Sequence, residues 1–137
     1  MKTLIVVAGV LTEEGKVLVT QRKEDSPHGG LWEFPGGKMM EGEEPREALR
    51  RELKEELDIE VEVGRISDAV FEAHLRDPIL LLAFRCRKMK GHLKPLGCAN
   101  LQWVHLKDLE RLAMPPADDP IRKRLCSLEE AELLFSL

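Results

Sequence analysis

The sequence predicts one domain of the α/β or α+β class, in which strands and helices form a layered sandwich. Apolar segments rich in β-forming residues occur before and after one acidic helical segment, and a second helical segment follows them, which is the order of a mixed sandwich. The chain has 137 residues, of which 43% are hydrophobic, so it is long enough to build one core. We therefore expect a single domain over residues 1–137.

The first part of the chain predicts a hairpin followed by a loop and a short strand. Residues 3–11 form an apolar, β-rich run, residues 17–21 alternate as a second strand, and Glu14-Gly15 is the turn between them. Residues 22–30 are polar and contain Pro and Gly breakers. Residues 31–34 are expected to form a short strand, which the Pro-Gly-Gly run after it should end.

Residues 45–57 predict an acidic helix. Pro45 suits the first helical position, where the missing N–H costs nothing, and Glu43 and Glu44 lie where the positive end of the helix dipole favours carboxylates. The residues that follow are mostly strong helix formers.

The second half predicts further strands and a closing helix. Strands are expected at residues 60–63 and 69–74, as one strand interrupted near Gly64, and at residues 78–86 and 101–105. The remaining residues are expected to form a loop at 88–98, a short helix at 107–112, a connector at 114–120 and a last helix from 121 to about 135. Asp119 precedes Pro120 and is the expected cap of the last helix.

The composition argues against several classes of protein. The formal net charge is 21 − 25 = −4, which does not suit a surface for a nucleic-acid polymer, and no apolar run is long enough to span a membrane. The beginning of the chain is better read as a strand than as a signal peptide. Cys86, Cys98 and Cys126 match no zinc spacing and are expected to be reduced thiols, so the expected location is the cytoplasm.

The acidic helix gathers three carboxylates on one side. At about 100° per residue, Glu52, Glu55 and Glu56 share one arc. Beside that arc runs an apolar stripe formed by Leu49, Leu53 and Leu57. The acids therefore lie at the edge of the buried face, where like charges repel each other and partial burial adds a desolvation cost.

A divalent cation bound between the carboxylates would turn this net repulsion into a net attraction. Three carboxylates offer the hard oxygen ligands that Mg²⁺ and Mn²⁺ prefer. The alternative is an ordinary solvated helix, in which Glu47–Arg51 and Arg51–Glu55 supply i,i+4 ion pairs.

The loop before the helix favours the first reading, because loop and helix together resemble the Nudix box. That pattern is Gly, five residues, Glu, seven residues, Arg-Glu, an aliphatic, any residue, Glu-Glu, any residue, Gly and an aliphatic. The matching positions are Gly37, Glu43, Arg51, Glu52, Leu53, Glu55, Glu56 and Ile59. Asp58 stands where the pattern has Gly, at the expected C-cap, and Asp tolerates the left-handed conformation better than most residues.

The resemblance implies a Nudix fold, a mixed β-sheet sandwiched between α-helices, and an enzyme that hydrolyses phosphoanhydride bonds. The metal ligands would be the carboxylates of Glu52, Glu55 and Glu56 together with the carbonyl of Gly37, holding Mg²⁺ with Mn²⁺ as a possible substitute. Glu52 would be the central carboxylate. Arg51 would orient it, unless Arg51 is only a helix-surface charge, and Glu43 would be a supporting acid, unless it serves only the helix dipole.

Two flanking segments resemble the MutT-type subgroup, which cleaves nucleoside triphosphates to the monophosphate and pyrophosphate. These segments are residues 31–38 and 115–120. The subgroup includes enzymes that remove oxidised guanine nucleotides and relatives that act on CTP or modified pyrimidine nucleotides. The substrate-binding candidates, each weighed against core packing or plain solvation, are Arg22, Lys38, Phe34 and Asp118, with His28 and Phe84 as weaker candidates. An ionised Asp118 only accepts hydrogen bonds, so it would favour a base edge that presents donors.

One loop position departs from the subgroup. Its members often carry another acid six residues before the tryptophan of the late strand, and counting back from Trp103 gives Gly97. Glu72 or Asp77 is then a candidate to compensate. Two other functions stay open: a Nudix hydrolase for ADP-ribose, a nucleotide sugar or a dinucleoside polyphosphate, and a non-catalytic Nudix-fold ligand sensor. The expected partner is the nucleotide substrate, and the protein is expected to be a monomer or a homodimer.

Overall fold

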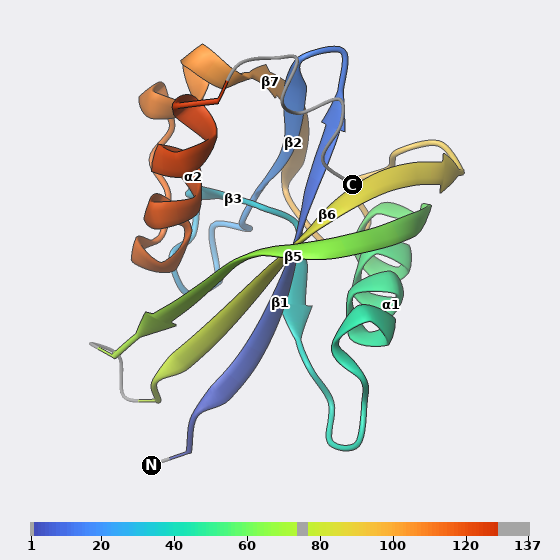
Figure 1. Ribbon diagram of the computed structural model, residues 1–137, viewed down its shortest axis with the longest axis vertical. Coiled ribbons are helices and arrows are strands. Elements are labelled where there is room, and N and C mark those ends of the chain that lie inside the picture. The colour runs from blue at the N-terminus through green and yellow to red at the C-terminus, as the bar shows by residue number, and fades with distance from the viewer. Residues whose placement is uncertain (1, 74–76, 129–137) are drawn as a thin grey trace.

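The computed structural model describes residues 2–73 and 77–128 (Figure 1). Its elements are β1 (Leu4–Glu13), β2 (Lys16–Gln21), β3 (Trp32–Glu33), β4 (Gly36–Lys38), α1 (Pro45–Leu57), β5 (Glu60–Glu72), β6 (Ile79–Lys90), β7 (Asn100–His105), the 3₁₀ helices η1 (Leu106–Arg111) and η2 (Pro116–Asp118), and α2 (Asp119–Cys126). None of the helices in these described ranges is long and apolar enough to cross a membrane.

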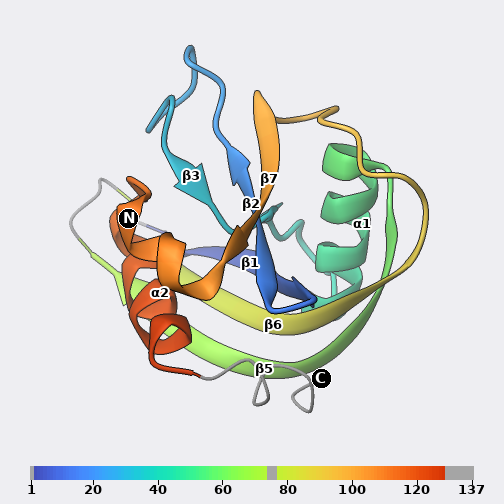
Figure 2. The ribbon, with the colours of Figure 1, turned by 90° about the horizontal axis from the view of Figure 1, so that it is seen from above.

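The strands form one mixed sheet with β1 at its centre. β1 pairs in parallel with β6 and antiparallel with β2 and β4, and the main path through the sheet is β3-β2-β1-β6-β5. α1 and α2 lie on opposite sides of this sheet (Figures 1 and 2). The expected class, a mixed sheet sandwiched between helices, is confirmed.

The alternation of side chains along β1 supplies both cores. Val7 and Leu11 pack into the cluster that contains the leucines of α1, whereas Ala8 and Val10 pack into the cluster that contains Ile121 of α2. This period of two is what a strand buried on both faces requires. The central strand thus holds the two helices at fixed positions on either side of the sheet.

The predicted hairpin of β1 and β2 is confirmed, with Thr12 opposite Val17 and Glu13 opposite Lys16. Glu14 and Gly15 both have positive φ, 51° and 76°, as a two-residue type I′ turn requires.

The expectation that the Pro-Gly-Gly run only ends a strand was wrong. Gly36 and Gly37 belong to β4, which pairs with Ala8 and Val7 of β1. A Cβ on Gly36 would lie 1.9 Å from the carbonyl oxygen of Val7, so only glycine lets the two backbones approach this closely. Glycine here permits a strand instead of breaking one.

β5 and β6 differ from the prediction at their ends. β5 runs without a break from Glu60 to Glu72, and the expected interruption near Gly64 is a shift of register between Val63 and Ile66. The predicted end at residue 74 lies outside the described residues. β6 extends to Lys90, beyond the predicted end at residue 86, because Lys88 and Lys90 pair with β5 despite their polar side chains.

Helix α1 begins and ends where the sequence predicts. The Glu44 side chain accepts a hydrogen bond from the backbone N–H of Glu47, and Asp58 takes the left-handed conformation (φ 58°) while its N–H bonds to the carbonyl of Lys54. Asp58 therefore forms the left-handed C-cap for which the pattern has glycine. The leucine stripe of α1 is fully buried, as predicted.

The C-terminal elements differ from the prediction in helix type and in length. Residues 106–111 form a 3₁₀ helix, and α2 ends at Cys126 instead of continuing toward 135, with residues 129–137 outside the described part. Asp119 is the first residue of α2, where it pairs with Arg122 and Lys123, so its predicted role as N-cap was wrong.

Candidate active site

Arg51 is the centre of the acidic cluster on α1. Its guanidinium donates to both oxygens of Glu43 at 2.7 and 3.0 Å, to Glu52 at 2.9 Å and to Glu55 at 3.1 Å. It also donates to the backbone carbonyl of Lys38 at 3.1 Å. These bonds connect the helix to the loop before it and to β4, so one cation fixes three carboxylates.

Glu52 lies directly over the backbone of β4. A Cβ on Gly37 would come within 2.4 Å of the carboxylate of Glu52, a distance that no side chain tolerates. The glycine therefore allows the Glu52 carboxylate to approach the chain at the point where the carbonyl of Gly37 is the predicted ligand. Glu52 is largely buried, while the Glu55 side chain is 58% exposed.

Glu56 occupies a different environment from the other acids of the helix. Burial, reinforced by the nearby carboxylates of Glu33 and Glu52, raises the pKa of Glu56 to about 8. Its backbone carbonyl accepts from the N–H groups of Leu96 and Gly97 at 2.9 and 3.0 Å. The loop position where an acid was expected thus covers the C-terminal turn of α1 beside Glu56.

The donor set fits a hard divalent cation. The predicted ligands offer only oxygen atoms, and Glu56 carries a buried carboxyl that a nearby positive charge would return to its ionised form. In the described residues no three His, Cys, Asp or Glu side chains already converge in a metal-ligand arrangement. The guanidinium of Arg51 instead bonds to Glu43, Glu52 and Glu55 together, so binding a cation would require the carboxylates to turn toward it.

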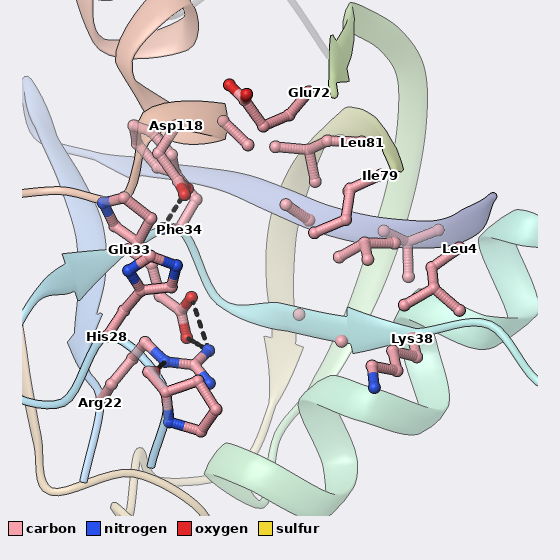
Figure 3. A pocket seen from close by; sticks show the side chains of 18 of the residues that line it. Leu4, Arg22, His28, Glu33, Phe34, Lys38, Glu72, Ile79, Leu81 and Asp118 are labelled. Carbon is pink, nitrogen blue, oxygen red and sulfur yellow. Dashed lines mark hydrogen bonds and ion pairs between the residues drawn. The ribbon is translucent and has the colours of Figure 1, made fainter. Parts of the chain in front are cut away.

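A cavity of about 460 Å³ opens beside this cluster (Figure 3). Its apolar wall comes mostly from the central strands and from the segment before α2, and includes Leu4, Val6, Val7, Ala8, Ile79, Leu81, Phe34, Pro115 and Ala117. Polar groups line the remainder: Arg22, His28, Glu33, Gly37, Lys38, Glu72, Asp77 and Asp118. In Figure 3 Lys38 and Asp118 lie at opposite sides of the cavity.

Asp118 is the deepest carboxyl of the cavity, with only 6% of the residue exposed. Its Oδ1 accepts a hydrogen bond from the backbone N–H of Phe34 at 3.2 Å. Burial, with the nearby Glu33 carboxylate, raises the pKa of Asp118 to about 7. The ionised form of Asp118 is the acceptor considered from the sequence, but near neutral pH the protonated form is also present and donates.

Arg22 lines the cavity but is not a free cation. Its Nη1 donates to the two carboxylate oxygens of Glu33 at 3.1 and 3.2 Å, and its Nε donates to the carbonyl of Pro27 at 2.6 Å. The two aromatic candidates predicted from the sequence differ in their position relative to the cavity. Phe34 is buried in the core and lines the cavity, whereas Phe84 is a core residue under the guanidinium of Arg46, 4.9 Å from its ring centre, and does not line the cavity.

Glu72 and Asp77 line the cavity. The carboxylates that raise the pKa of Glu56 are those of Glu33 and Glu52. The idea that Glu72 or Asp77 replaces the acid missing at Gly97 therefore stays a prediction.

Two residues that the sequence reasoning missed lie between the cluster and the cavity. Glu33 on β3 faces Arg22 and influences both Glu56 and Asp118. Thr20 on β2, opposite Glu33 in the sheet, is fully buried beside Glu56. The available signal was an acid in an otherwise apolar short strand, at a position alternating with the buried Phe34.

The chain is similar to known proteins over nearly all of its length. A family model described as the NUDIX domain matches residues 1–125. A CTP pyrophosphohydrolase of Escherichia coli is 36% identical over 135 residues, which is 96% of this chain and 97% of that protein. An 8-oxo-dGTP diphosphatase of Proteus vulgaris is 44% identical over 93 residues, 67% of this chain and 83% of that protein. The solution structure of the E. coli ORF135 protein is 36% identical and superimposes with a TM-score of 0.81 over 90% of this chain and 88% of that one.

Proposed function

The chain belongs to the Nudix family of hydrolases, and from this membership we propose that it is a Mg²⁺-dependent nucleoside triphosphate pyrophosphohydrolase. Nudix hydrolases generally use a divalent metal, and Mg²⁺, with Mn²⁺ as a possible substitute, is our choice for this chain. The products would be the nucleoside monophosphate and pyrophosphate.

One observation carries the proposal: Gly37 lines the cavity and also lies against the acidic cluster. Its backbone lines the cavity, and the Glu52 carboxylate lies so close to it that a Cβ would be only 2.4 Å away. A base held at the Asp118 side would therefore direct its phosphates toward Lys38 and the carboxylates of α1. This is the geometry that a nucleotide with a phosphoanhydride requires.

The roles of the chain's own residues follow from their contacts. Glu52, Glu55 and Glu56, with the carbonyl of Gly37, would hold the cation, and Arg51 would orient Glu52 through its 2.9 Å bond. Glu43 would fix Arg51, with which it makes two hydrogen bonds. Bound there, the cation would neutralise phosphate oxygens and lower the pKa of the attacking water. Water would add to a phosphorus atom, the anhydride P–O bond would break, and a carboxylate of the cluster would take the proton.

The substrate would be held by the cavity. Lys38 is an exposed cation next to Gly37 and suits a phosphate, and Arg22, which is paired with Glu33, suits the region between phosphate and base. The carboxyl of Asp118, whose Oδ1 accepts from the Phe34 N–H, would meet the base edge through its other oxygen. A donor-bearing edge, such as the amino group of cytosine or the N1–H and N2–H₂ of guanine, fits an acceptor at Asp118.

Both relatives described above are named for nucleoside triphosphates, CTP in one and an oxidised dGTP in the other. If the protein prefers an oxidised or modified nucleotide, its role would be to remove that nucleotide from the nucleotide pool and so to protect DNA. Hydrolysis of ADP-ribose, a nucleotide sugar or a dinucleoside polyphosphate is the alternative. The intact Glu52, Glu55 and Glu56 argue against a non-catalytic sensor.

The experiment is product release from purified protein with Mg²⁺ on a matched panel. The panel contains CTP, dCTP, dGTP, 8-oxo-dGTP, ADP-ribose and a dinucleoside polyphosphate. We expect pyrophosphate and a monophosphate from one of the triphosphates. Activity only on ADP-ribose or the dinucleotide would contradict the proposal, and so would orthophosphate as the first product.

A further inference from the structure

Thr20 presents a buried hydroxyl to the end of α1 that carries Glu56. It lies on β2 with Leu18, which packs in the core beneath α1, so the alternation of the strand turns Thr20 to the same face. Thr20 is 0% exposed, and its Oγ1 makes no hydrogen bond of good geometry within the described residues. A buried hydroxyl left unsatisfied is destabilising, so its presence calls for an explanation.

The neighbours of Thr20 in the sheet direct this hydroxyl toward the acidic cluster. Glu33 of β3 is opposite Thr20 on one side and Leu101 of β7 on the other. Paired residues point to the same face of a sheet, so Thr20 and Glu33 both face the end of α1. The hydroxyl lies close enough to the carboxyl of Glu56 to lower its pKa, in opposition to burial.

Glu56 has few other donors. The carboxylates that act on it, Glu33 and Glu52, repel its ionised form. Arg22 is the nearby cation, and its guanidinium is already bonded to Glu33. On the other side Gly97 brings only backbone, so close that an added Cβ would lie 3.3 Å from the Cα of Glu56.

We propose that Thr20 is a positioning residue, whose Oγ1–H donates to one oxygen of the ionised Glu56 carboxylate and thereby leaves the other oxygen directed at the divalent cation. This rests on the proposed metal site. A hydroxyl rotates freely and the carboxylate accepts on either oxygen, so a small turn of Glu56 would complete the bond. Partners of this kind fix the orientation of a ligand, and their loss typically costs about 10–100-fold in metal affinity.

A purely structural role for Thr20 predicts a different result from the same substitution. Thr20→Val keeps the shape and removes the hydroxyl, so if that hydroxyl serves nothing, the metal-free protein should become more stable and metal binding should not change. In our account the metal-free protein is equally or more stable, but Mn²⁺ binds about tenfold more weakly. A folding defect would lower both the stability and the metal affinity, whereas our account predicts a loss of metal affinity without a loss of stability.

The test is Mn²⁺ titration without substrate, followed by electron paramagnetic resonance of the free ion, alongside thermal unfolding in EDTA. Thr20→Ser keeps the hydroxyl and should restore wild-type affinity, and Thr20→Ala is a second variant without it. Thr12→Val, the same change on β1 at the hairpin end, is the matched control and should bind Mn²⁺ like wild type. Equal Mn²⁺ dissociation constants for wild type, Thr20→Val and Thr20→Ala would overturn the proposal.

Different experimental results would contradict the role of Thr20 and the proposed function. A wild-type protein that releases pyrophosphate, together with unchanged Mn²⁺ affinity in the Thr20 variants, removes only the role of Thr20. A wild-type protein that neither binds Mn²⁺ nor hydrolyses a triphosphate overturns both.

Discussion

The guanidinium of Arg51 donates two hydrogen bonds to the carboxylate of Glu43, Nε to Oε2 at 2.7 Å and Nη2 to Oε1 at 3.0 Å. Such a forked pair fixes direction as well as distance. The Arg51 bonds lower the pKa of Glu43 to about 2, so the pair stays ionised at any pH at which the protein would work. Arg51 then reaches Glu52 in an orientation that Glu43 sets.

Glu43→Gln should lower kcat by about tenfold or more, because the loss of a partner that orients a site residue typically has this effect. The amide offers one acceptor in place of two and leaves Arg51 free to turn. The measurement is steady-state turnover with Mg²⁺. Glu44→Ala is the matched control: it removes the helix cap, should cost about 1 kcal/mol of stability and should leave kcat unchanged. If the two substitutions reduced kcat equally, Glu43 would act only through the helix.

Glu52→Gln should reduce hydrolysis by roughly a hundredfold or more while the protein stays folded, because the central carboxylate of the cluster loses its charge. Circular dichroism and thermal unfolding would establish folding, and pyrophosphate release would measure turnover. Glu47→Gln removes the same charge from an exposed position of the same helix and should be silent. Wild-type turnover by Glu52→Gln would show that Glu52 has been assigned wrongly.

Gly37→Ala should inactivate the protein by displacing Glu52, since the added Cβ would stand 2.4 Å from the carboxylate. The comparison is Gly42→Ala, where no atom lies within 4 Å but φ is +79°. That variant should lose about 1 kcal/mol of stability or more through backbone strain and keep its kcat. Equal kcat losses in the two variants would contradict the account of Gly37.

Asp118→Asn should change how stability depends on pH. The folded pKa of Asp118 is raised from 3.8 to about 7, so between these values the unfolded chain releases a proton that the folded chain keeps. Wild-type stability therefore falls as pH rises through this window, by at most about 1.4 kcal/mol per pH unit from this group. Asn does not titrate and keeps an acceptor for the Phe34 N–H. The free energy of unfolding of the variant should therefore rise relative to that of wild type between pH 4 and pH 7.

Urea unfolding of both proteins at pH 4.5, 5.5, 6.5 and 7.5 measures this difference. The contribution of Glu56, whose pKa is also raised, is common to both proteins and cancels. Parallel stability curves would contradict a raised pKa at Asp118.

The parts of the fold that could be predicted are those encoded by neighbouring residues. The helix from Pro45 to Leu57 was predicted to the residue, because its first proline, its helix formers and its capping positions are all local. The hairpin turn at Glu14 and Gly15 is local in the same way. Helical spacing placed Glu52, Glu55 and Glu56 on one arc of this helix, and their use as metal ligands stays a prediction.

The errors lie where a partner far along the chain decides the structure. Gly36 forms a strand because β1 approaches it, and Lys88 to Lys90 continue β6 because Glu60 and Val61 pair with them. The two-sided environment of Glu56 depends on Thr20 and Glu33, which are more than twenty residues away from it in sequence. The local pattern marks Glu33 only as an acid in an apolar strand and does not show which helix it faces, so the sequence indicated the acids of the helix but not the residues around them.

The most direct test of the whole account is ³¹P NMR of the reaction of the wild-type protein with Mg²⁺ and a nucleoside triphosphate, with CTP and 8-oxo-dGTP as the first two substrates. The account predicts that the triphosphate signals are replaced by those of one monophosphate and one pyrophosphate in equal amounts, and that Glu52→Gln leaves the triphosphate intact. The appearance of a nucleoside diphosphate with orthophosphate, or of the same products from Glu52→Gln at the wild-type rate, would contradict it.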